Sequence, residues 1–353
     1  NSGLGDWYVN EEKLGGPLSR IADAVNEMGM KFGLWIEPEM VNEDSDLYRE
    51  HPDWAYIIPG RKPVRGRNQL VLDFSRKEVV DYIFEQISSV IDKANVEYIK
   101  MDMNRSICDV FTAVEGYQNY GKIMYDYVLG VYDFIERLNK RYPDMLLEGC
   151  SGGGGRFDMG MLYYTPQIWC SDDTDAIERI KIQHGTSFCY PACTVGAHVS
   201  AVPNHQTGRT TDLKTRAVVA MAGSFGYELD LQLLTEAERE EVREQIVEYK
   251  KYQPLIYGGD YYRLSDPLKN TEIAAWAFVS RDKNEVLLNI VSLDTHGNEP
   301  TNYVRMKGLK PDGNYRCEET GEIYSGAVLM HVGYPVPVIM GEYKAWQLYL
   351  TAC

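Results

Sequence analysis

Short apolar runs alternate with amphipathic stretches up to about residue 254 of the chain. Within residues 17–30, Leu18, Ile21, Val25 and Met28 recur at helical spacing, which predicts a helix. Seven apolar runs predict strands, at residues 32–36, 69–74, 98–103, 145–150, 167–171, 194–199 and 222–227. Strands that alternate with helices at this spacing predict a parallel sheet, and seven of them predict a (β/α)8 TIM barrel. We expect the eighth strand to precede Asn1.

Two capping-box patterns predict where helices begin. Ser75 with Glu78 opens one helix, and Thr235 with Glu238 opens a charged helix that we expect to end before Pro254. A long helix is also predicted from about residue 120 to residue 140.

From about residue 257 the apolar positions alternate with a period of two. The predicted strands are 273–279, 285–291, 303–306, 327–331 and 345–350. This pattern predicts an antiparallel β-sandwich of about 100 residues. We therefore divide the chain into a catalytic barrel over residues 1–254, incomplete at its N-terminus, and a C-terminal β-sandwich domain over residues 255–353.

Composition narrows the classes of partner. The net charge of −16 argues against nucleic acid and anionic membranes, which would be repelled. No apolar run is long enough for a transmembrane helix. The seven cysteines show no CxxC pair, which favours reduced thiols and a cytoplasmic protein. The six histidines lack zinc-like spacing, so we expect neither a metal nor another cofactor.

Polar side chains gather where the predicted strands end, which is where a barrel places its active site. Lys100 and Asp102 lie two residues apart in a strand and share one face, whereas Met101 points into the packing. A lysine beside a carboxylate lowers the pKa of that carboxylate and keeps it ionised, as a nucleophile requires. The alternative for this pair is a structural ion pair.

A second carboxylate, Asp172, ends the fifth predicted strand. Two acids at opposing strand ends fit glycoside hydrolysis, with a separation of about 5.5 Å for retention of configuration. Its neighbours Asp173 and Asp175, and also Asp73, could instead cap helices. The glycine run 152–155 is not followed by the lysine of a phosphate-binding loop, so it favours close approach of the backbone to a hydroxylated ligand.

Four segments resemble the microbial α-galactosidases of glycoside hydrolase family 36, namely residues 32–40, 98–105, 167–179 and 196–205. The resemblance implies hydrolysis of terminal α-linked galactose, as in melibiose and raffinose, by retaining double displacement without metal or cofactor. It implies Asp102 as nucleophile and Asp172 as acid/base. It implies galactose contacts from Trp35, Arg67, Lys100, Asn104, Cys150 and Gly152. It also implies a cytoplasmic homo-oligomer that acts on galactose-containing oligosaccharides.

The sequence departs from the family pattern in two ways. Met101 stands where the family has Trp, and strand alternation predicts that this change affects packing more than chemistry. The paired-Asp motif of the family's first barrel strand and its large N-terminal β domain would precede Asn1. We therefore expect residues 1–353 alone to hydrolyse α-galactosides poorly.

Three other functions fit the same residues. A galactosyl transferase of the raffinose- or stachyose-synthase kind would use both aspartates and exclude water. An α-N-acetylgalactosaminidase would need more room near Cys150. A non-catalytic sugar-binding fragment is the third alternative, and the presence of both carboxylates argues against it.

Overall fold

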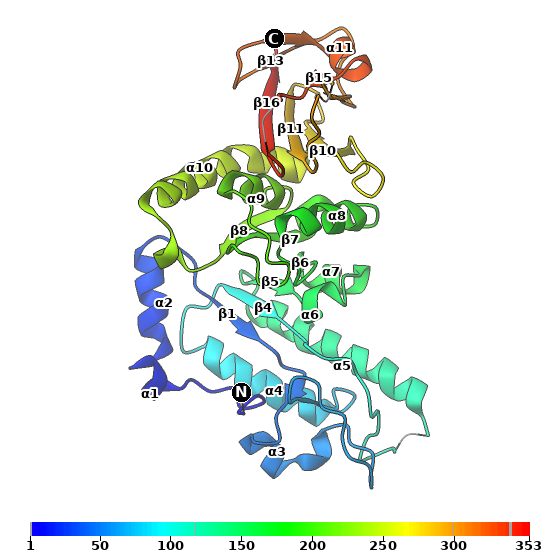
Figure 1. The fold of residues 1–353 in the computed structure, drawn as a ribbon. Coiled ribbons are helices and arrows are strands. Elements are labelled where there is room, and N and C mark those ends of the chain that lie inside the picture. The colour runs from blue at the N-terminus through cyan, green and yellow to red at the C-terminus, as the bar shows by residue number, and fades with distance from the viewer. Residues whose placement is uncertain (1, 117, 299, 339–340) are drawn as a thin grey trace. The chain divides into compact units, whose positions relative to one another are not determined.

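A computed structural model describes residues 2–116, 118–298, 300–338 and 341–353. The chain forms two compact units, Asn1–Trp169 and Cys170–Cys353, and each is described by itself. Figure 1 shows the order of helices and strands along the chain.

The first unit contains a parallel sheet in the order β1, β4, β5, β6. Its strands are β1 (Gly33–Ile36), β4 (Tyr98–Met101), β5 (Leu146–Gly149) and β6 (Gln167–Trp169). Its helices are α1 (Glu11–Leu14), α2 (Leu18–Glu27), α3 (Asp46–Glu50), η1 (Pro52–Trp54), α4 (Lys77–Ile91), α5 (Tyr120–Arg141), α6 (Ser151–Gly154) and α7 (Met159–Tyr164). Ile83 of α4 and Phe134 of α5 are buried with Ile99 of β4 in one core, as their spacing predicts.

The predicted strand 69–74 is not part of the parallel sheet. Within this run, Leu70–Val71 form β3, which pairs antiparallel with β2 (Met40–Val41). The backbone groups of this run form hydrogen bonds with loop residues; for example, the Tyr56 amide donates to the Val71 carbonyl. Periodicity cannot distinguish such a buried loop strand from a sheet strand. The prediction of seven barrel strands was therefore wrong, and six parallel strands lie in the described residues.

The capping box predicted at Ser75 was also wrong. The Ser75 hydroxyl donates to the Asp73 carboxylate, so it does not cap a helix. Helix α4 begins at Lys77 without a side-chain cap, and Glu78 instead accepts from Arg76.

The second unit begins with the parallel pair β7 (Val195–Ser200) and β8 (Ser224–Glu228). Its helices are α8 (Ala176–Thr186), η2 (Ala192–Thr194), α9 (Leu213–Ala220), η3 (Leu231–Leu233), α10 (Glu236–Gly258) and α11 (Gly326–His331). The capping box of Thr235 and Glu238 is confirmed at the start of α10. Helix α10 continues through Pro254 to Gly258, so the predicted end before Pro254 was wrong. Within the described residues, no helix is both long enough and apolar enough to cross a membrane.

The rest of the second unit is an antiparallel sheet with a small ribbon. The sheet order is β14 (Ile323–Ser325), β13 (Asn314–Cys317), β16 (Ala345–Ala352), β11 (Glu285–Ser292), β10 (Ile273–Val279) and β9 (Asp260–Arg263). The ribbon pairs β12 (Tyr303–Val304) with β15 (Tyr334–Pro335). Successive residues of β10 face opposite sides of the sheet. Trp276 belongs to one hydrophobic core together with Tyr252 of α10, and Ala277 belongs to a second core together with Val304.

One predicted strand of this domain is a helix. Residues 327–331 lie in α11 because the Ser325 hydroxyl accepts from the Val328 amide and caps the first turn.

Candidate active site

The parallel register sets a row of polar side chains across the first unit. Lys100 of β4 lies beside Trp35 of β1 on one side and Glu148 of β5 on the other. The Lys100 ammonium is 3.4 Å from the fully buried Glu148 carboxylate and 4.6 Å from the ring centroid of Trp169. The expectation that Lys100 pairs with Asp102 was therefore wrong, because the neighbouring strand supplies a buried carboxylate at the same level.

Asp102 follows β4 and is 6% exposed. Its Oδ2 accepts a hydrogen bond from the Trp35 indole at 3.2 Å and another from the side-chain amide of Asn104 at 2.7 Å. Its Oδ1 accepts from the backbone amides of Met103 at 2.8 Å and Gly152 at 3.0 Å. Burial by itself raises the pKa of this carboxyl, but the donors, led by the Gly152 amide, outweigh it and lower the pKa. Asp102 is thus held as an anion by hydrogen bonds rather than by a lysine.

The turn after β5 brings the Gly152 amide to Asp102. Ser151 and Gly152 have φ values of 61° and 60°, in the left-handed region where glycine is least strained. Cys150, just before this turn, is buried, and burial raises the pKa of its thiol to about 12. All seven cysteines are free thiols.

A buried carboxyl, Glu37, supports the loop that carries Asn104. Glu37 follows β1 and accepts a hydrogen bond from the backbone amide of Asn104 at 2.6 Å and one from the Gln69 side chain at 2.9 Å. Burial raises the pKa of Glu37, and the nearby Asp102 charge adds to the increase. Glu37 lies in the segment 32–40 that the sequence already singled out, but its role in holding Asn104 requires the fold.

Of the remaining predicted contacts in this unit, Arg67 forms no hydrogen bond or ion pair with the Asp102 cluster in the described residues. It is exposed in a left-handed turn with Asn68, at φ values of 52° and 63°. The structure thus brings Trp35, Asn104 and Gly152 onto Asp102, but it does not bring Arg67 there in the described residues.

Asp172 belongs to the second unit and is exposed at the start of the loop before α8. The neighbouring Asp175 is a helix cap, because its carboxylate accepts from the Ile177 amide at 2.8 Å and lies 2.6 Å from the Arg209 guanidinium. The capping alternative is therefore confirmed for Asp175. Asp73 is different, since it bonds Ser75 rather than a helix amide.

Glu148 and the pair of Glu39 with Arg156 were not predicted from the sequence as parts of the site. Glu148 is a carboxylate inside the apolar run 145–150, a pattern that indicates a paired buried charge. Arg156 directly follows the glycine run and binds Glu39 through two hydrogen bonds. Both carboxylates are fully buried.

Two family models match the chain. The Melibiase model matches residues 1–259, and the glycosyl hydrolase family 36 C-terminal domain model matches residues 273–350. The chain belongs to glycoside hydrolase family 36. The predicted resemblance is thereby confirmed.

Relatives of this family 36 chain are longer proteins. The bifunctional alpha-galactosidase/sucrose kinase AgaSK of Mediterraneibacter gnavus is 61% identical over 351 residues, which are 99% of this chain and 37% of that protein. Alpha-galactosidase AgaA of Geobacillus stearothermophilus is 48% identical over 347 residues, covering 98% of this chain and 47% of that protein. The chain spans less than half the length of these two relatives.

Solved family 36 structures share the fold. Alpha-galactosidase AgaB of Geobacillus stearothermophilus superposes with a TM-score of 0.97 at 47% identity, covering 100% of this chain and 48% of that chain. A variant of alpha-galactosidase AgaA in complex with raffinose superposes with a TM-score of 0.97 at 46% identity, covering 100% of this chain and 49% of that chain. The expected fold class, a (β/α)8 TIM barrel followed by a C-terminal antiparallel β-sandwich, is confirmed.

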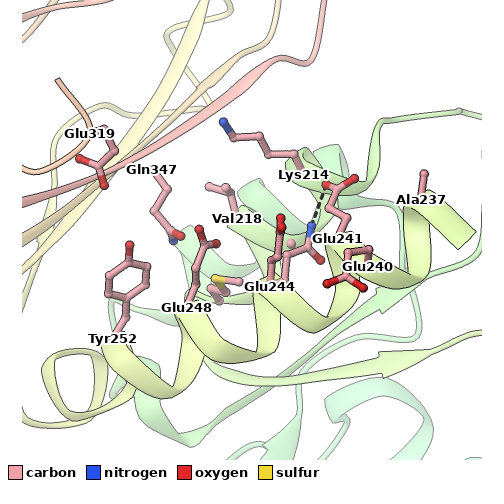
Figure 2. A pocket seen from close by; sticks show the side chains of 13 residues that line it. Lys214, Val218, Ala237, Glu240, Glu241, Glu244, Glu248, Tyr252, Glu319 and Gln347 are labelled. Atoms are coloured by element: carbon pink, nitrogen blue, oxygen red, sulfur yellow. Dashed lines mark hydrogen bonds between the residues drawn. The ribbon is translucent and has the colours of Figure 1, made fainter.

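The second unit of the family 36 chain also contains an acidic hollow of about 650 Å³ (Figure 2). Glu240, Glu241, Glu244 and Glu248 project toward it from α10, and Lys214 lies opposite. None of the predicted site residues lines this hollow. Cavity size alone therefore does not locate the candidate active site.

Proposed function

We propose that the protein is a retaining α-galactosidase that removes terminal α-linked galactose from oligosaccharides such as melibiose and raffinose. The observation that carries this proposal is the Asp102 carboxylate at the end of β4, which is buried, accepts hydrogen bonds from Trp35 and Gly152, and has a lowered pKa because of its donors. An anion held in this way is suited to attack an anomeric carbon. Family membership supports the substrate class, since an AgaA variant has been solved with raffinose and another with stachyose.

In this proposal Asp102 is the nucleophile and Asp172 the general acid/base. Asp102 forms a covalent glycosyl intermediate while Asp172 protonates the leaving oxygen, and Asp172 then activates water. Trp35, Lys100, Asn104, Cys150 and Gly152 contact galactose together with Arg67. Lys100 can offer ammonium protons to sugar hydroxyls, because Glu148 and Trp169 fix it on the same face of the sheet as Asp102.

Replacing Asp102 by Gly in the full-length protein tests the nucleophile. Turnover should be lost, and added azide should restore part of it as the β-galactosyl azide, because azide enters from the face that the carboxylate vacated. Formation of the α-azide, or full activity of the Asp102→Gly variant, would overturn the assignment.

Replacing Asp172 by Ala tests the acid/base. Glycosylation by a dinitrophenyl galactoside needs little proton donation and should be almost unchanged, whereas melibiose hydrolysis should fall strongly. Equal losses on the two substrates would point to another acid, with Asp173 as the next candidate.

We further propose a cytoplasmic homo-oligomer, with the barrel over residues 1–254 and the sandwich domain over residues 255–353. Seven free thiols support the compartment, and the separate family models for residues 1–259 and 273–350 support the boundary. Light scattering of the full-length protein tests the oligomeric state.

A further inference from the structure

The turn that aims the Gly152 amide is anchored by an ion pair between the partly buried Arg156 and the fully buried Glu39. Ser151 is a non-glycine residue at φ 61°, a conformation that L side chains adopt only when their surroundings fix it. Its hydroxyl accepts from Arg156 Nε at 2.6 Å. The neighbouring Gly152 amide donates to Asp102 Oδ1 at 3.0 Å.

Arg156 is fixed in turn by a carboxylate from another element. Its two terminal nitrogens donate to the two oxygens of Glu39 at 3.0 and 2.8 Å. Glu39 is fully buried and accepts a further hydrogen bond from the Tyr127 hydroxyl of α5 at 2.5 Å. A bidentate pair of this kind leaves the guanidinium one orientation, with Nε toward Ser151.

We propose that Arg156, clamped by Glu39, is a positioning residue that holds Ser151 in the left-handed conformation and so aims the Gly152 amide at Asp102. This inference rests on the proposed role of Asp102 as nucleophile. Arg156 acts through the turn and does not itself touch the carboxylate in the described residues.

The conformation of this turn should affect the pKa of Asp102. Among the hydrogen bonds that lower the pKa of Asp102, the one from the Gly152 amide contributes most. Relaxation of the turn should lengthen that bond and raise the pKa of Asp102. The other ionisable groups near Asp102 in this unit are Glu37 after β1, Lys100 on β4 and Cys150 after β5. Arg156 variants leave all three in place.

The experiment is the pH profile of kcat/KM for nitrophenyl α-galactoside with the full-length protein, whose acid limb reports the nucleophile in the free enzyme. Arg156→Lys keeps the positive charge but cannot bridge Glu39 and Ser151 together. Its acid limb should move to higher pH by about one unit, the size of shift expected for a lost hydrogen bond to a charged group. KM should change less than kcat.

Substitutions at Ser151 separate conformation from folding. Ser151→Ala removes the anchor and retains the strain, so its acid limb should move as in Arg156→Lys. Ser151→Gly also removes the anchoring hydroxyl, but glycine adopts the left-handed conformation without strain. This variant should therefore keep most of the parent pH profile. Tyr127→Phe is the matched control, because it weakens the same buried network without breaking the path to Asp102. It should lower Tm and leave the acid limb in place.

Two results would overturn the inference. One is an unchanged acid limb in both Arg156→Lys and Ser151→Ala, and the other is an equal shift in Tyr127→Phe. If Asp102→Gly is inactive and rescued by azide while the limb stays fixed, only the positioning role fails. If Asp102→Gly remains active, the proposed function fails instead.

Discussion

Two parts of the molecule are rich in carboxylates, and they differ in how these carboxylates are buried and hydrogen-bonded. After β1 and β4, the carboxylates of Glu37, Glu39 and Asp102 are buried, and each accepts hydrogen bonds from donors that the fold holds in place. In the acidic hollow beside α10, Glu244 and Glu248 are exposed and face one another's charge (Figure 2).

The pKa directions express this difference. Donors lower the pKa of Asp102 despite its burial. For Glu248, partial desolvation in the hollow and the charges of Glu244 and Glu319 raise the pKa, and the charges of Lys214 and Lys251 compensate only in part. A count of acidic residues therefore does not identify a reactive carboxylate. Fixed donors are what keep a buried carboxylate ionised, but they do not by themselves distinguish a reactive carboxylate from a structural one such as Asp175.

The strongest test of this contrast is a pair of amide substitutions. Asp102→Asn should reduce kcat/KM at least about 10⁴-fold, because the nucleophile is removed. It should also lower stability by roughly 1–3 kcal/mol, since its NH₂ group must face a hydrogen-bond donor. Glu244→Gln in the hollow should leave kcat/KM unchanged and should not lower stability. Steady-state kinetics and urea denaturation measure both, and comparable losses in the two variants would remove the distinction.

Glu148→Gln tests whether a buried carboxylate positions Lys100. Without its counter-charge Lys100 should shift from the sugar site, and kcat/KM should fall about 10²-fold. Stability should fall by up to about 3 kcal/mol, because breaking a buried pair leaves one charge unpaired. The double variant Lys100→Met with Glu148→Gln should regain stability but not activity. Recovery of activity in the double variant would contradict a role for Lys100 in binding.

Asp175→Asn sharpens the comparison, because Asp175 is held by donors but serves structure. Burial opposes ionisation here, but Thr207 and Arg209 lower the pKa of Asp175 below its ordinary value. Its stabilising effect is therefore full above the unfolded pKa near ~3.9 and is lost as pH falls through the lower folded pKa. The variant should lose about 2 kcal/mol at pH 7. Thermal unfolding at pH 7 and at pH 2 should show a difference that shrinks at low pH, and a constant difference would exclude the ionised carboxylate as its cause.

The smallest effect is expected at Glu248, whose folded pKa is raised. Stability should therefore fall as pH rises from the unfolded pKa near ~4.3 through the folded pKa. Glu248→Gln removes this penalty, so the variant should be more stable than the parent at pH 8 by less than about 1 kcal/mol, because solvent screens an exposed group. At pH 4 the two should unfold together. Glu240→Gln is the control, since it removes an exposed pair with Arg243 and should not stabilise.

Local patterns in the sequence determined much of the fold. Helical spacing located α4 and α5, and the period of two located β10, β11 and β16, because these periods follow from local backbone geometry. The same alternation placed Lys100 and Asp102 on one face and buried Met101, which is 1% exposed. The family and the fold class were also readable, since the motifs at strand ends are long and ordered.

Only the tertiary structure decided which groups meet. The run 69–74 has the composition of a sheet strand, but its partner is β2, a pairing across about 30 residues that local pattern cannot specify. Lys100 has Asp102 two residues away, yet the β4–β5 register places Glu148 beside it. The Gly152 amide reaches Asp102 only because a left-handed turn follows β5. Hydrogen bonds and ion pairs depend on distances between segments remote in sequence, and those distances are set by packing and register rather than by local periodicity.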